Sequence, residues 1–124
     1  MSMSPDVRTT RAILVADDEE HVRSLLGRVL GHAGYIVITA RDGRAALEVI
    51  ADLARPIDLL LTDASMPLLA GPELIREARK LRPDLKVICL SAHVHDRYVG
   101  DGIHYLPKPF ALAGVLQKVS ELLC

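Results

Sequence analysis

The chain has 124 residues, which is enough for one domain with its own hydrophobic core. Half of the residues are hydrophobic and a quarter are charged, as in soluble globular proteins. The net charge of -1 argues against a dedicated nucleic-acid surface, which is usually strongly basic.

The cysteine content and the hydropathy of the chain bear on its location. The two cysteines, Cys89 and Cys124, imply no disulfide framework and favour a reducing compartment. No apolar run approaches the roughly 18 residues that a membrane span needs. Residues 1–10 lack the apolar stretch of a signal peptide and are interpreted as a polar lead-in. We therefore expect a cytoplasmic protein whose domain makes no contact with membrane or nucleic acid.

From residue 12 onward, short apolar runs alternate with residues at helical spacing. The predicted strands are residues 12–16, 35–39, 57–62, 87–90 and 103–106. Helices are predicted after the first, second, third and fifth strands, over residues 22–30, 42–53, 71–81 and 112–122. Continuously apolar strands that alternate with helices indicate an α/β fold, with a parallel sheet covered on both faces.

The connection between Ser91 and Ile103 departs from this pattern. It has little apolar periodicity and contains Gly100 and Gly102. We expect at most a turn or two of helix there, which makes it a shortened fourth helix in an otherwise regular alternation.

Polar residues follow four of the five predicted strands. In open parallel sheets, ligands bind beyond the carboxyl ends of the strands. The first strand is followed by Asp17 and Asp18, and the third by Asp63. Ser91 follows the fourth strand and Lys108 comes shortly after the fifth, whereas the end of the second strand supplies no comparable group.

These residue types suit phosphoryl transfer if the first and third strands are neighbours. Three carboxylates in one pocket repel one another and stay ionised only beside a compensating cation. Mg²⁺ prefers such oxygen ligands, and Mn²⁺ is an alternative ion. Lys108 adds a positive charge and Ser91 a hydroxyl donor. Asp63 in that setting could attack a phosphoryl group and form an acyl phosphate.

Several short motifs, taken together, resemble the receiver domain of two-component response regulators. They are Asp17-Asp18-Glu19, Asp58-Leu-Leu-Leu-Thr-Asp63 with Met66-Pro67 and Gly71, Ser91-Ala92, and Lys108-Pro109-Phe110. The resemblance covers nearly the whole chain, so the receiver domain is expected over residues 11–124. It implies a flavodoxin-like doubly wound sheet of five parallel strands in the order 2-1-3-4-5, as in chemotaxis regulators.

The resemblance also implies a role for each matching carboxylate. Asp63 would be the phosphoacceptor. Asp18 and Asp63 would bind Mg²⁺ directly, and Asp17 would bind it through water. The backbone carbonyl of Ser65 would complete the protein ligands.

Three further residues receive roles from the resemblance. Lys108 would pair with the phosphate, and a cis peptide bond to Pro109 would aim it at the site. Ser91 would hydrogen-bond a phosphoryl oxygen and move toward it on activation. Tyr105 would act as an aromatic switch that packs inward when Ser91 moves.

The implied function is that of a signalling module that receives its phosphoryl group from a histidine kinase or a histidine phosphotransfer protein. It would catalyse its own phosphorylation and dephosphorylation and turn over no external metabolite. The short connection before the fifth strand and residues 81–86 are similar to receivers of hybrid histidine kinases. The oligomeric state is left open.

Two other functions fit the same fold class, because fold alone does not decide function. One is a phosphorylation-independent interaction module on a receiver fold, which the intact set of motifs disfavours. The other is a flavodoxin-like cofactor binder. The acidic residues after the first strand and the absence of a glycine-rich phosphate loop disfavour it, as does the presence of only four aromatic residues.

Overall fold

The computed structural model describes residues 10–92 and 102–123, which form a single parallel sheet with helices on both faces. The strands are β1 (Ala12–Ala16), β2 (Ile36–Ala40), β3 (Leu59–Asp63), β4 (Lys86–Ser91) and β5 (Ile103–Pro107). The helices are α1 (Glu20–His32), α2 (Gly43–Ala51), α3 (Gly71–Leu81) and α4 (Leu112–Leu123). The strand order is β2-β1-β3-β4-β5, and every pairing is parallel, so the predicted fold is confirmed.

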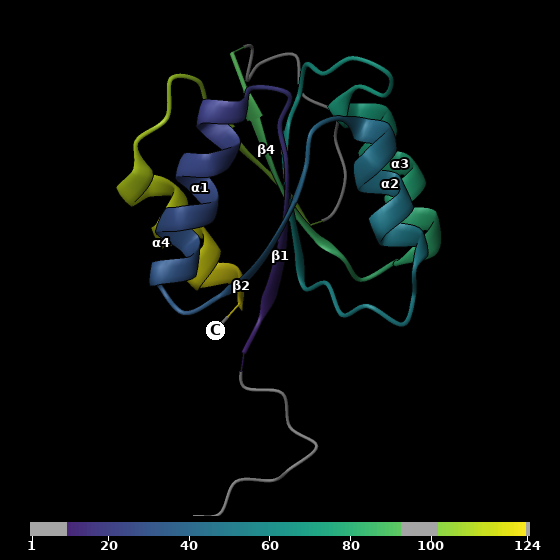
Figure 1. Ribbon diagram of the computed structural model, residues 1–124, viewed down its shortest axis with the longest axis horizontal. Coiled ribbons are helices and arrows are strands. Elements are labelled where there is room, and N and C mark those ends of the chain that lie inside the picture. The colour runs from purple at the N-terminus through teal and green to yellow at the C-terminus, as the bar shows by residue number, and fades with distance from the viewer. Residues whose placement is uncertain (1–9, 93–101, 124) are drawn as a thin grey trace, which may run out of the picture.

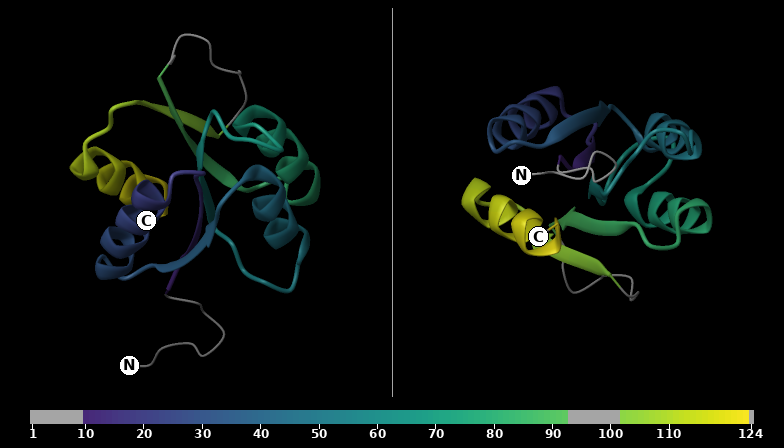
Figure 2. Two further views of the ribbon diagram at one scale, coloured as in Figure 1. Left: turned by 45° about the horizontal axis from the view of Figure 1, so that its top comes forward. Right: turned by 90° about the horizontal axis from the view of Figure 1, so that it is seen from below.

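The helices lie in two layers around the sheet. Helices α1 and α4 cover one face, and α2 and α3 cover the other, as Figures 1 and 2 show. Successive side chains of a strand point to opposite faces. In β1, therefore, Ile13 and Val15 pack toward α1 and α4, whereas Leu14 and Ala16 pack toward α2 and α3. Both β1 and β3 are buried along their whole length, which explains their continuous apolar runs.

The boundaries agree with the prediction to within a few residues at each end, where helices and strands commonly fray. The third strand begins at Leu59 rather than Ile57. Before it, the Asp58 carboxylate accepts a hydrogen bond of 2.7 Å from the Ala12 amide, which ties the start of β3 to the start of β1. The predicted shortened fourth helix falls on residues 93–101, outside the described residues. Across 10–92 and 102–123, no helix has the length and apolarity to span a membrane.

Arg82 joins the two helices on one face of the sheet. It follows the last residue of α3 and donates three hydrogen bonds to backbone carbonyls at the end of α2. Its Nε lies 3.0 Å from the Ile50 oxygen, and its Nη2 lies 2.9 Å from the oxygens of Asp52 and Arg55. A helix leaves its last carbonyls without partners inside the helix, and a cation there is also attracted to the negative end of the helix dipole. Arg82 therefore serves as a cap on α2 from outside it.

Replacing Arg82 by Ala should lower the free energy of unfolding by about 2 kcal/mol, because hydrogen bonds from a charged donor are lost at a helix end. Urea denaturation measures the change. Lys80→Ala is the matched control, since Lys80 makes an exposed ion pair with Glu77 and its loss should cost at most about 0.5 kcal/mol. Equal losses for the two variants would contradict the capping role.

Candidate functional site

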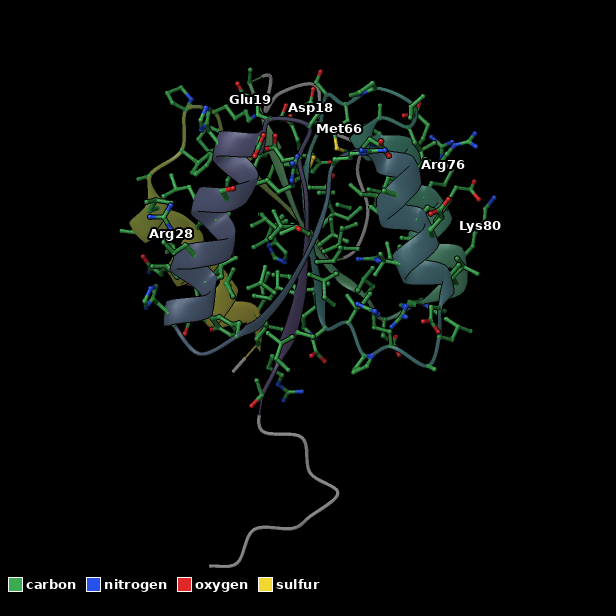
Figure 3. The ribbon with its side chains drawn as sticks, in the orientation of Figure 1. Asp18, Glu19, Arg28, Met66, Arg76 and Lys80 are labelled. Atoms are coloured by element: carbon green, nitrogen blue, oxygen red, sulfur yellow. The ribbon has the colours of Figure 1, made fainter. Side chains whose placement is uncertain are left out.

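The carboxyl edge of the sheet gathers three aspartates. Because β1 and β3 are hydrogen-bonded neighbours, Asp17 and Asp18 come beside Asp63. One carboxylate oxygen from each residue lies within 4.8 Å of the other two. Figure 3 shows Asp18 and Glu19 at this end of the sheet, and Met66 from the β3–α3 loop at the same end. The three carboxylates therefore meet, as expected if the first and third strands are neighbours.

Asp17 is the most buried of the three, with 1% of its surface exposed. Its Oδ1 accepts a hydrogen bond of 2.9 Å from the Glu19 amide, but its Oδ2 is buried and has no hydrogen-bond partner among residues 10–92 and 102–123. Burial raises the pKa of Asp17, and the charge of Asp63 adds to the rise, while the Glu19 bond opposes it. A buried carboxylate oxygen without a partner costs free energy unless it is protonated or meets a cation or an ordered water.

Asp63 is buried and is paired with a lysine. Its Oδ1 lies 3.0 Å from Nζ of Lys108, and 27% of the Lys108 side chain is exposed. Burial alone would lower the pKa of Lys108, but the hydrogen bond and charge of Asp63 outweigh it and raise that pKa. Lys108 is therefore charged at neutral pH. The Lys108–Pro109 peptide is cis, as predicted.

The remaining predicted residues surround this pair. Ser91 is buried at the end of β4, and its carbonyl accepts a hydrogen bond of 2.9 Å from the Lys108 amide. The Ser65 amide lies 3.4 Å from Oδ1 of Asp63, at the long end of hydrogen bonding. Tyr105 is partly buried and packs on the α2–α3 side of the sheet, where it pairs with Cys89, two residues before Ser91 along β4. The described structure thus brings every predicted site residue to one region, and their individual roles stay predictions.

Two residues near the site were not anticipated as contributors. Arg23, in the second turn of α1, donates a hydrogen bond of 2.8 Å from Nη1 to the Asp17 carbonyl. Cys89 lies in β4 below the site, where burial, assisted by the Asp63 charge, raises the pKa of its thiol to about 12. Cys89 stays protonated and is not a competing nucleophile. An arginine six residues after an aspartate has no distinctive pattern, so the Arg23 contact required the structure.

Comparison with known proteins agrees with this geometry. The family model described as the response regulator receiver domain matches residues 13–120. The receiver domain of the hybrid histidine kinase CckA is similar, with a TM-score of 0.81 and 34% identity over 91% of this chain and 99% of that one. The response regulator protein TrrA of Thermotoga maritima, solved in complex with Mg(2+)-BeF, has a TM-score of 0.79 at 35% identity, covering 92% and 100% of the two chains.

Curated relatives are longer than this chain. The sensor kinase CckA of Brucella abortus is 35% identical over 95% of the chain, which spans 13% of that protein. The response regulator MprA of Mycolicibacterium vanbaalenii is 43% identical over 90% of the chain, which spans 49% of that protein. Family model, fold and relatives agree, and the chain belongs to the response regulator receiver domain family of two-component signalling proteins.

Proposed function

We propose that Asp63 is the residue on which this receiver domain accepts its phosphoryl group, from a histidine kinase or a histidine phosphotransfer protein. The observation that carries the proposal is the setting of Asp63. It is a buried carboxylate with a lysine ammonium at 3.0 Å and with oxygens of two further carboxylates within 4.8 Å. Two-component receivers are signalling modules rather than metabolic enzymes, so the reaction is the modification of the domain itself.

The residues fit a divalent cation of the magnesium class. Three carboxylates offer hard oxygen ligands, and the unpartnered Oδ2 of Asp17 is a buried polar atom that such a site would use. Asp18, Asp63 and the Ser65 carbonyl would hold Mg²⁺, with Asp17 acting through water. Mn²⁺ would be accepted by the same ligands. When bound, the cation supplies positive charge that offsets the carboxylates and the oxygens of an incoming phosphoryl group.

The chain's own residues account for the rest of the chemistry. A carboxylate oxygen of Asp63 forms a bond to phosphorus as the phosphorus–nitrogen bond of the phosphohistidine breaks, and the electron pair stays on the imidazole. Lys108, held charged beside Asp63, neutralises the acyl phosphate that results. Catalysis here is mainly positioning and charge neutralisation, so a preformed pair of Asp63 and Lys108 is suited to it.

Ser91 and Tyr105 are the proposed readout of the modification. The Ser91 hydroxyl would donate to a phosphoryl oxygen on Asp63, and Tyr105 would adjust its packing when Ser91 moves. The backbone supports this coupling, because β3, β4 and β5 are joined at the site level by the bonds from Ala64 to Leu90 and from Lys108 to Ser91. The proposal takes residues 11–124 as the receiver unit, in a cytoplasmic location consistent with the buried free thiol of Cys89.

Incubation of the purified chain with a small phosphodonor and Mg²⁺ should label it on one residue, and Asp63→Asn should take no label. Mass spectrometry of the intact protein measures the added phosphoryl group. Asp84→Asn is the matched control, since Asp84 is exposed just before β4 and should leave labelling unchanged. Equal labelling of the Asp63 variant, or none in the wild type with Mg²⁺, would remove the proposal.

Asp17→Asn should stabilise the metal-free protein by about 1 kcal/mol, because it removes a buried charge while Oδ1 still accepts the Glu19 bond. The pKa of Asp17 is raised in the folded protein, so the ionised carboxylate destabilises the fold at pH values above the ordinary aspartate pKa. In acid, where Asp17 is protonated in both states, the stability difference between the wild type and the variant should vanish.

Thermal denaturation in a chelator and then in Mg²⁺ checks both halves of this expectation. Mg²⁺ should raise the midpoint of the wild type more than that of the variant, because a cation that binds only the folded state stabilises it. A variant that is less stable than the wild type in chelator would show that the Asp17 charge is compensated by other means.

A further inference from the structure

The segment after the edge strand β2 carries none of the proposed ligands, yet it contacts both loops that carry the carboxylates. On one side, the Asp17 amide donates a hydrogen bond of 3.1 Å to the Ala40 carbonyl. Three residues later, Gly43 packs against Leu69 in the β3–α3 loop. In Figure 1, the β2–α2 connection and the β3–α3 connection lie at the same end of the sheet. Residues 40–43, here called the bridge, therefore contact Asp17 of the β1–α1 loop and Leu69 of the β3–α3 loop.

The contact between Gly43 and Leu69 is backbone against backbone. A Cβ atom added to Gly43 would overlap the Leu69 carbonyl oxygen and would lie 2.6 Å from Leu69 Cβ. Real Cβ atoms essentially never come that close to another heavy atom, and a main-chain carbonyl cannot rotate away as a flexible side chain can. Only glycine, which has no Cβ, permits this approach.

The first turn of α2 is held firmly on its own side of the contact. The Asp42 Oδ1 accepts a hydrogen bond of 2.8 Å from the Ala45 amide, which caps the helix. The Ala46 amide donates to the Asp42 carbonyl at 3.1 Å, and Ala46 is fully buried in the core. Gly43 thus presents a fixed surface, and a larger residue there would displace the β3–α3 loop instead.

The β3–α3 loop is stiff enough to pass such a displacement to Asp63. Its ends are closed by a hydrogen bond of 3.0 Å from the Gly71 amide to the Ala64 carbonyl. At its tip the Leu69 amide donates to Pro67 at 2.8 Å, around a left-handed Leu68 with a φ of 71°. Gly71 also lies so close to the Asp63 carbonyl that a Cβ on it would approach to 2.6 Å.

We infer that the bridge sets the spacing of the two metal-ligating loops, so that Gly43 is a positioning residue for cation binding. The inference rests on the proposed function, because it concerns the same carboxylates. The bridge holds the Asp17 backbone through Ala40 and the β3–α3 loop through Gly43. Groups that hold the metal-binding residues in orientation typically contribute 10- to 100-fold to metal affinity.

The test is the affinity for Mn²⁺, with free Mn²⁺ counted by electron paramagnetic resonance in the absence of any phosphodonor. Gly43→Ala should weaken binding by roughly tenfold relative to the wild type. Asp42→Ala, which loosens the same turn without adding bulk, should weaken binding in the same direction by a smaller factor. If Gly43→Ala fails to fold, the Mn²⁺ affinity of Asp42→Ala tests the positioning role of the bridge instead.

Two matched controls separate positioning from a general loss of stability. Gly31→Ala adds the same methyl group to α1, where a Cβ meets no atom within 4 Å, and should leave Mn²⁺ affinity unchanged. Arg82→Ala destabilises α2 at its far end, where Arg82 caps the Ile50 carbonyl, and should also leave the affinity unchanged. A merely structural Gly43 would behave like Arg82 in this assay.

The outcomes distinguish the two proposals. Wild-type protein that binds Mn²⁺ in a manner abolished by Asp18→Asn, together with selective weakening in Gly43→Ala, supports both. The same wild-type binding with unchanged affinity in folded Gly43→Ala and Asp42→Ala overturns the positioning role alone. Equal weakening in Arg82→Ala overturns it as well. A wild type that binds no Mn²⁺ overturns the proposed cation site, and the positioning role with it.

Discussion

Three carboxylates share one edge of the sheet, and their mutual repulsion is the constraint to which the surrounding residues respond. Lys108 offsets part of that negative charge through its contact of 3.0 Å with Asp63. Among the described residues, the buried Asp17 carboxylate has one oxygen without a hydrogen-bond partner, so these residues compensate its charge only in part. A site in this condition favours any species that brings positive charge to it, and that preference is the physical basis of a cation-dependent switch.

The parallel sheet creates this edge and also stiffens it. All five strands end at the same side, so their carboxyl ends collect side chains from distant parts of the sequence. Backbone hydrogen bonds continue just past the strand ends, from Asp17 to Ala40, from Ala64 to Leu90 and from Lys108 to Ser91. Each of these bonds fixes a loop that bears a site residue. The backbone hydrogen bonds of the sheet therefore hold the carboxylates close together despite their repulsion. The buried core on both faces stabilises the sheet in turn.

A second layer of contacts supports the carboxylates without touching them. Arg23 donates a hydrogen bond to the Asp17 carbonyl. Gly43, at the start of α2, packs closely against Leu69, and Gly71, at the start of α3, packs closely against the Asp63 carbonyl. Left-handed Leu68, with 70% of its surface exposed, sits at the tip of that loop. An exposed apolar residue in a backbone region that disfavours side chains is a local departure from stability rules, and such departures concentrate at functional sites.

The sequence by itself determined the alternation of strands and helices, because hydrophobic periodicity is a local signal that core burial imposes on each segment. It also predicted Asp17, Asp18, Asp63, Ser91 and Lys108 as candidate site residues, because charged and hydroxyl residues that follow apolar strands differ clearly from them. Only the tertiary structure decided that Asp17 is buried while its neighbour Asp18 is exposed, since that depends on which loop covers which oxygen. It alone revealed the bridge after β2, because neither contact that joins the bridge to the two loops is made by a polar side chain. Those contacts involve main-chain atoms, which every residue has, so they cannot be predicted from residue type. The exception is a glycine at a position where no side chain fits.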